Sequence, residues 1–149
     1  MIRGYFLTEG GRARPFVDAV FRFPSLPARP FRVPLLVDTG ADRTLIGPFD
    51  AQALQREFEL ELGRLPRGPR STGVGGSVDT RAIDALIQLD AFSLPLRLTI
   101  LDQPPGAPLL RLPSLLGRDV LSQFALFFEE RTGRVLLLEP HEADALNLS

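Results

Sequence analysis

A carboxylate at the end of an apolar run is the feature that most constrains this chain. Residues 35–47 are LLVDTGADRTLIG, so two leucines and a valine lead directly into Asp38, and the apolar pattern resumes at Leu45. The run predicts a fully buried strand, and a buried Asp is rare unless its carboxylate is paired or hydrogen-bonded. Gly40 permits a tight turn, which would present Asp38 at a fixed point on a rigid scaffold. In a less specific interpretation, Asp38 only forms an Asx-turn with its own backbone.

Alternating apolar residues indicate that most of the chain forms β-strands. In residues 16–23, one face would be wholly apolar, with Val17, Ala19, Phe21 and Phe23 on it. The predicted strands are 2–8 and 16–23 around the glycine-rich turn EGGR, then 31–37, 71–78, 78–89, 94–101 and 112–117, and a final hairpin over 125–139. Short helices are predicted at 48–58 and 118–124. The class is therefore all-β with one or two short helices, in a small barrel-like fold that forms a single domain over residues 1–149.

Composition excludes several classes of function. The chain has no Cys and one His, His141, so a thiolate nucleophile, a Cys-ligated metal and a His-based triad within one chain are excluded. The net charge of -1 gives no field that favours nucleic acid or an acidic membrane. The N-terminus lacks the apolar segment of a signal peptide, and no apolar run approaches the ~20 residues of a membrane span. We therefore expect a cytoplasmic protein with no metal, no cofactor and no nucleic-acid or membrane partner.

Two further segments extend the pattern around Asp38. Residues 72–78, TGVGGSV, place glycines between two strand-like ends, and residues 115–121, LLGRDVL, again set Gly and charged residues after an apolar run. Together with VDTGAD at 37–42, these motifs and their order resemble the retroviral-type aspartic proteases, the single-domain retropepsin-like family. The resemblance covers about residues 31–125. It implies a small closed β-barrel with a flap hairpin and one catalytic Asp per chain.

The resemblance implies an aspartic endopeptidase that hydrolyses peptide bonds in a peptide or protein substrate. Asp38 would be catalytic, and because the chain has one Asp-Thr-Gly, the second Asp38 must come from another copy in a homodimer. Thr39 would interlock with its counterpart across the dimer axis, and Gly40 would offer its backbone to the substrate. Ala41 lacks the hydroxyl that pepsin-like enzymes usually place beside the catalytic carboxylate, so we expect activity at mildly acidic pH. The chemistry requires no metal and no cofactor.

Supporting residues also follow from the resemblance. Asp42 and Arg118 would form an ion pair that braces the active-site loop, whereas the plain alternative is two unrelated surface charges. Asp119 occupies a position for which we expect a structural role. A glycine-rich flap would open for an extended peptide and close over it, and its residues are Gly73, Val74, Gly75 and Gly76. An ordinary glycine-rich hairpin turn is the alternative to a flap.

The chain departs from the family pattern beyond residue 125. Retroviral proteases usually dimerise through interleaved terminal strands, whereas here residues 125–139 continue as a hairpin followed by a polar tail. That hairpin would extend the dimer interface, replace it, or keep the chain monomeric. A monomer would be a catalytically inactive peptide-binding or regulatory module on the same fold, which is the alternative function. A different hydrolase is a third class, although a phosphoaspartyl enzyme of the DxDxT kind is disfavoured because residue 40 is Gly.

Overall fold

The structure is a computed structural model that describes residues 1–73, 76–104, 106 and 111–148. In chain order its strands and helices are β1 (Ile2–Arg3), β2 (Tyr5–Glu9), β3 (Arg12–Arg22), β4 (Phe31–Val37), β5 (Leu45–Ile46), α1 (Pro48–Phe58), the 3₁₀ helix η1 (Leu62–Arg64), β6 (Ser71–Gly73), β7 (Gly76–Val78), β8 (Thr80–Leu89), β9 (Phe92–Leu101), β10 (Leu115–Leu116), α2 (Arg118–Leu121), β11 (Ala125–Glu129), β12 (Arg134–Leu138) and α3 (Pro140–Asp144). The expected all-β class is confirmed, and the short helices outnumber the one or two that were expected.

The main sheet closes on itself. Its strands follow the order β2-β3-β4-β10-β5-β9-β8, and β8 also pairs with β3. The six strands β3, β4, β10, β5, β9 and β8 therefore form a ring, and β2 is attached to it through β3. Two neighbouring pairs are parallel, namely β4 with β10 and β5 with β9, and the other pairs are antiparallel. The parallel pairing of β4 with β10 sets the end of β10 beside Asp38, the residue that follows β4.

The core fills the inside of this ring. The predicted apolar face of β3 is buried as expected, with Val17, Ala19, Phe21 and Phe23 at most 3% exposed. Helix α1 covers one end of the ring of strands. Its Phe58 side chain packs edge to face against Phe23, with the centroids of the two aromatic rings 5.6 Å apart. Burial of a side chain of this size contributes about 2–3 kcal/mol to the free energy of unfolding.

Strand β4 is buried on one face only, which corrects the expectation of a fully buried strand. Phe31, Val33, Leu35 and Val37 point into the core, whereas Arg32 and Pro34 are exposed. A strand of a closed ring has one face toward the core and one toward solvent, so alternation is the expected burial pattern. Asp38, at the end of β4, is correspondingly half-buried and not fully buried.

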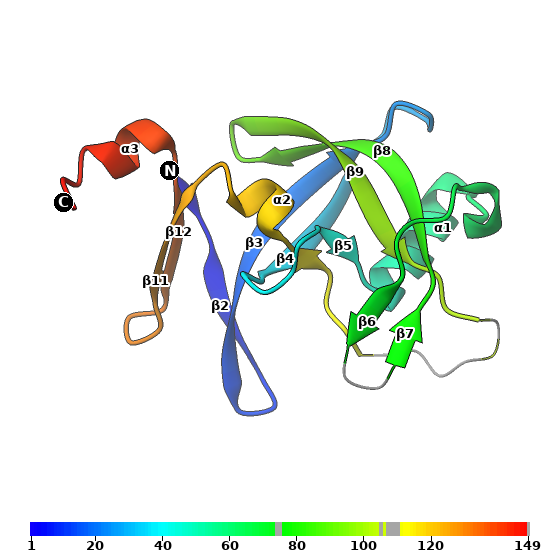
Figure 1. Cartoon of the computed structure of the whole chain (residues 1–149), viewed down its shortest axis with the longest axis horizontal. Coiled ribbons are helices and arrows are strands. Elements are labelled where there is room, and N and C mark those ends of the chain that lie inside the picture. Colours follow the sequence, from blue (N-terminus) through cyan, green and yellow to red (C-terminus); the bar gives the residue numbers. More distant parts are fainter. Residues whose placement is uncertain (74–75, 105, 107–110, 149) are drawn as a thin grey trace.

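A second, three-stranded sheet joins both ends of the chain. Its order is β1-β12-β11, and Figure 1 shows it at one end of the molecule beside α3 and both termini, with α1 at the other end. The strand expected at 2–8 is split at Gly4, whose N–H donates to the carbonyl of Val135 at 2.8 Å. A Cβ at Gly4 would lie 2.4 Å from the carbonyl oxygen of Phe16, so only Gly fits where the two sheets approach. The hairpin expected over 125–139 is present as β11 and β12.

Helix α3 was not expected from the sequence, which predicted only a polar tail. Pro140 occupies a first-turn position, where its missing N–H costs nothing, and Glu142 accepts a hydrogen bond from the N–H of Glu139 at 3.0 Å. These are start signals of a helix.

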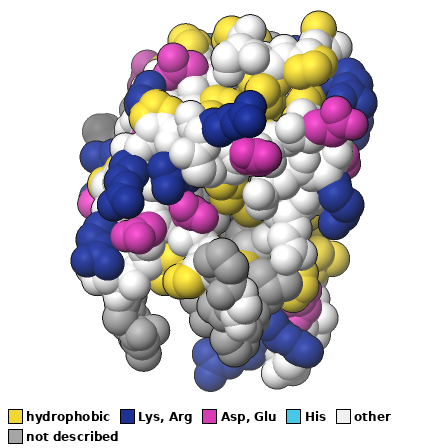
Figure 2. Space-filling model, turned by 90° about the vertical axis from the view of Figure 1, so that its right-hand side faces the viewer, with side chains coloured by type: hydrophobic (Ala, Val, Ile, Leu, Met, Phe, Trp, Pro, Cys, Tyr) yellow, Lys and Arg dark blue, Asp and Glu magenta, His cyan; other side chains and the backbone are white. Residues whose placement is uncertain are grey.

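Within the described part of the chain, no helix has both the length and the apolar character needed to cross a membrane. On the face drawn in Figure 2, basic and acidic side chains are interspersed around a central hollow.

Candidate active site

Asp38 lies where β4 ends beside β10. The register pairs Val37 with Leu116, and the N–H of Asp38 donates to the carbonyl of Leu116 at 3.1 Å. The N–H of Gly40 donates to Asp38 Oδ1 at 2.9 Å, which is the Asx-turn that the sequence left open. No hydrogen bond from a described residue reaches the second oxygen, Oδ2. The local turn therefore orients the carboxylate and leaves one oxygen for another group.

The loop after Asp38 is attached to the start of α2. Thr44 is fully buried, and its N–H and hydroxyl both donate to the carboxylate of Asp119, the hydroxyl at 2.7 Å. The same hydroxyl accepts a hydrogen bond from the N–H of Gly117 at 3.2 Å. Asp119 is thus structural, in agreement with the expected role. Because buried polar groups must find partners, this cluster fixes the loop on β10 and α2.

The loop and α2 also approach each other through their backbones. The N–H of Arg118 donates to the carbonyl of Ala41 at 2.8 Å, and the N–H of Asp119 donates to the carbonyl of Asp42 at 3.2 Å. A Cβ on Gly117 would lie 2.4 Å from the carbonyl carbon of Arg43, so the close approach requires Gly at this position. The conformation of the Asp38 loop therefore depends on residues more than 70 positions later in the chain.

The structure brings Asp42 and Arg118 together, as the family resemblance implied. The Arg118 guanidinium and the Asp42 carboxylate form an ion pair across the same junction. Their side chains are 61% and 77% exposed, so water screens the attraction. The pair contributes orientation of the loop more than free energy of folding.

A groove of about 480 Å³ opens beside Asp38. Its walls come from the Asp38 loop, from β6 and the two residues before it, and from single residues of β5, β9 and β10: Asp38, Gly40, Ala41, Asp42, Arg43, Leu45, Pro69, Arg70, Ser71, Thr72, Thr99 and Leu115. The volume is within the range of about 300–1,000 Å³ that is typical of ligand sites. The predicted residues Gly40, Ala41 and Asp42 thus border one groove with Asp38. Thr39 is exposed and does not line it.

Of the predicted flap residues, Gly73 ends β6 and Gly76 begins β7, and these two residues pair with each other in the hairpin β6–β7. Val74 and Gly75 lie outside the described residues. The base of the hairpin is held by the hydroxyl of Thr80, which donates to the carbonyl of Pro69 at 2.5 Å. Residues 69–72 line the groove, so the hairpin borders the Asp38 site.

Several residues of the site were not found from the sequence. Thr44 was missed, although a hydroxyl two residues after Asp42 and a carboxylate at the start of a predicted helix are a recognisable pair once the helix is placed beside the loop. Arg43 and Arg70 were also missed, because they come from segments 27 residues apart that meet only in the folded chain. No local pattern marks such residues.

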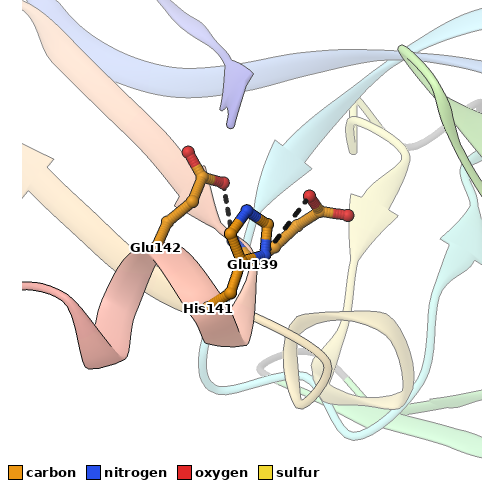
Figure 3. Close-up of side chains that lie close together, drawn as sticks. All are labelled: Glu139, His141 and Glu142. Atoms are coloured by element: carbon orange, nitrogen blue, oxygen red, sulfur yellow. Dashed lines mark hydrogen bonds and ion pairs between the residues drawn. The ribbon is translucent and has the colours of Figure 1, made fainter.

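A second cluster of polar groups lies far from this groove, in and before α3. Glu139, His141 and Glu142 converge there, as Figure 3 shows. The Glu142 carboxylate already binds the ammonium of Met1 at 2.7 Å and the N–H of Glu139. The hydrogen bond to the chain terminus is the main cause that lowers the pKa of Glu142. His141 is 76% exposed. The cluster therefore caps the N-terminus of a short helix, and the ion pair with Met1 links this helix to the start of β1.

Asp38 thus stands at a strand end of a closed ring of strands, beside a hairpin. Known structures share the fold of this chain. The chain is similar to the EIAV protease in complex with the inhibitor HBY-793, at 24% identity and a TM-score of 0.50, with 78% of this chain and 92% of that chain covered. It is also similar to a retropepsin-like aspartic protease from Rickettsia conorii, at 16% identity and a TM-score of 0.59, with 89% and 98% covered.

A third similar structure is the retroviral protease-like domain of Ddi1 from Leishmania major, at 16% identity and a TM-score of 0.45, with 84% and 94% covered. No family model matches the chain, and no curated protein matches it. The likeness to the first two structures, over most of the chain, shows that this protein has the retropepsin-like aspartic protease fold. The fold that the sequence resemblance implied is confirmed.

Proposed function

We propose that this protein is an aspartic endopeptidase that acts as a homodimer, in which two copies of Asp38 form one site. The position of Asp38 carries the proposal. The residue ends a strand of a retropepsin-like fold, lines a groove, and keeps one carboxylate oxygen without a donor among the described residues. The hairpin beside the groove supports a flap role for residues 73–76.

The chemistry needs only two carboxylates and water. Two carboxylates a few ångströms apart cannot both be ionised cheaply, so they share one proton. The ionised Asp38 takes a proton from a water that lies between them, while the protonated Asp38 hydrogen-bonds the scissile carbonyl oxygen. The water oxygen attacks the carbonyl carbon while the protonated Asp38 gives its proton to the carbonyl oxygen, which forms a tetrahedral diol. As the diol collapses, the Asp38 that took the water proton passes it to the leaving nitrogen and the other Asp38 takes back a hydroxyl proton, so that the products are a carboxylic acid and an amine.

An apolar surface next to the Asp38 loop supports the dimer. Thr39 is exposed and borders a pocket of about 320 Å³ with Pro15, Val37, Leu126 and Phe128. Phe128 is 50% exposed and its strand, β11, is an edge strand. Edge strands with exposed apolar side chains favour pairing with another chain. In this proposal the hairpin β11–β12 extends the interface, and Thr39 of each copy meets its counterpart.

The proposed activity is tested by peptide cleavage. A proteome-derived peptide library is incubated with the wild type and with Asp38→Asn between pH 4 and pH 7, and the products are read by mass spectrometry. Cuts made by the wild type and absent with Asp38→Asn are expected. Absence of any cut would favour the inactive peptide-binding module instead, and cuts that persist in the variant would show that cleavage does not depend on Asp38.

The dimer is tested separately by analytical ultracentrifugation. Phe128→Asp would place a charge on the proposed interface, so we expect its dissociation constant to rise at least tenfold, in line with about 1.4 kcal/mol or more for a buried interface charge. Phe49→Asp is the matched control, because Phe49 is 54% exposed on α1 and lies outside this pocket. Equal weakening by both variants, or a wild type that stays monomeric at all concentrations, would contradict this interface.

A further inference from the structure

We propose that the Asp38 groove selects peptides that carry an acidic side chain, an inference that rests on the proposed binding of peptides in this groove. Two arginines of the groove carry the argument. Arg43 follows Asp42 in the loop that forms one wall, and Arg70 precedes β6 on the wall formed by the hairpin. Both side chains are exposed and both line the same groove of about 480 Å³.

The charged side chains of the groove differ in whether they already have an ion-pair partner. Asp42 is neutralised by Arg118, which stands outside the lining. Arg70 is paired with Asp79, with its Nε atom 3.3 Å from the carboxylate, and both side chains are more than half exposed. No carboxylate in the described part of the chain lies within ion-pair distance of Arg43. Among the described groove residues, Arg43 is therefore a cation without an ion-pair partner, and Arg70 is bound only by an exposed partner.

A single carboxylate is the ligand that suits this arrangement. A guanidinium donates two parallel N–H bonds to a carboxylate, which gives both attraction and orientation. A polyanion is disfavoured because the Asp38 carboxylate lies in the same groove. Since the arginines are exposed, each contributes a modest preference, about two- to fivefold in affinity, which salt reduces. The groove thus favours Asp or Glu at one position of an otherwise ordinary peptide.

The test measures binding, so that it does not depend on cleavage. Each pool of fluorescent octapeptides has either Glu or Gln fixed at one position, and there is one such pair of pools for every position. The pools are titrated with Asp38→Asn protein, and anisotropy gives the dissociation constants. The Gln/Glu ratio of these constants should exceed about two at one position or more. In the Arg43→Gln, Arg70→Gln double variant this ratio should fall to one. Arg32→Gln removes one positive charge from the solvent-exposed face of β4, outside the groove, and should leave the ratio unchanged.

One further variant predicts a change in the opposite direction. Asp79→Asn removes the internal partner of Arg70, so the preference for Glu should increase. Equal binding of Glu and Gln pools at every position, or a preference that survives in the double variant, would overturn the proposal. Failure of the proposed function would be visible separately, as Glu-selective binding without any Asp38-dependent cleavage by the wild type.

Discussion

Replacing Thr44 with Val tests whether the Asp38 loop is held by hydrogen bonds or only by packing. Val has nearly the shape of Thr but lacks the hydroxyl, which donates to Asp119 at 2.7 Å and accepts from Gly117 at 3.2 Å. Loss of a hydrogen bond to a charged group costs about 1.5–3 kcal/mol, and a buried N–H without a partner costs about 1–3 kcal/mol. Asp119 keeps its hydrogen bond from the Thr44 backbone, so we expect a loss of about 2–4 kcal/mol in the free energy of unfolding.

Thr44→Ser provides the matched comparison, because it keeps the hydroxyl and removes one methyl group. Its expected cost is about 1 kcal/mol, from lost burial and a small cavity. Urea unfolding at pH 7 and equal protein concentration, followed by far-UV circular dichroism, measures both variants. The Val variant should unfold at a lower urea concentration than the Ser variant. If Ser costs as much as Val, or if Val is as stable as the wild type, the hydrogen-bond account of the loop is wrong.

Three further outcomes are expected. Gly117→Ala would set a Cβ 2.4 Å from the backbone carbonyl carbon of Arg43 in the Asp38 loop. The free energy of unfolding should therefore fall by about 2–3 kcal/mol. An unchanged calorimetric Tm would contradict this. Burial and a hydrogen bond to Asp18 raise the pKa of Tyr5 to about 12. The stability it contributes is complete below about pH 10 and is lost as the pH rises through 12. Tyr5 is the one Tyr in a chain without Trp, so phenolate absorbance reports it directly, and a midpoint near 10 would refute the prediction. Hydrogen bonds, led by that from Thr132, lower the pKa of Glu129 to about 2, so its contribution to stability is lost as the pH falls from about 4.5 to 2. Glu129→Gln should flatten the stability profile there, and an unaltered profile would oppose this.

The sequence predicted the fold where local patterns are strong. The alternation of Val17 to Phe23 identified the core face of β3, and the helix predicted at 48–58 coincides with α1. Residues 140–144 were missed, although Pro140 and Glu142 carry the start signals of a helix. The split of the first strand at Gly4 was also missed, because it depends on a distant strand, β12, that takes over pairing there.

For the site, the sequence supplied Asp38 and its neighbours in the loop but missed Thr44, Arg43 and Arg70. Asp38 and its Gly40 turn follow from a local motif, and the Asp42–Arg118 pair was found only through resemblance to a family. Thr44 carries no local signal because its partners lie 73 and 75 residues away. The burial of Asp38 was overstated, since an apolar run does not reveal which face of a strand meets solvent.

The attachment of the Asp38 loop to α2 has a consequence for the growing chain. During synthesis, 81 residues separate Asp38 from Asp119, which corresponds to about 4–16 s at the usual rates of translation. Contacts this distant in sequence form slowly, after nearer ones. Until Asp119 has left the ribosome, nothing braces the loop from the α2 side. A nascent chain therefore passes its least folded stage without the geometry that peptide hydrolysis would require, and the site matures only after residue 119 has emerged.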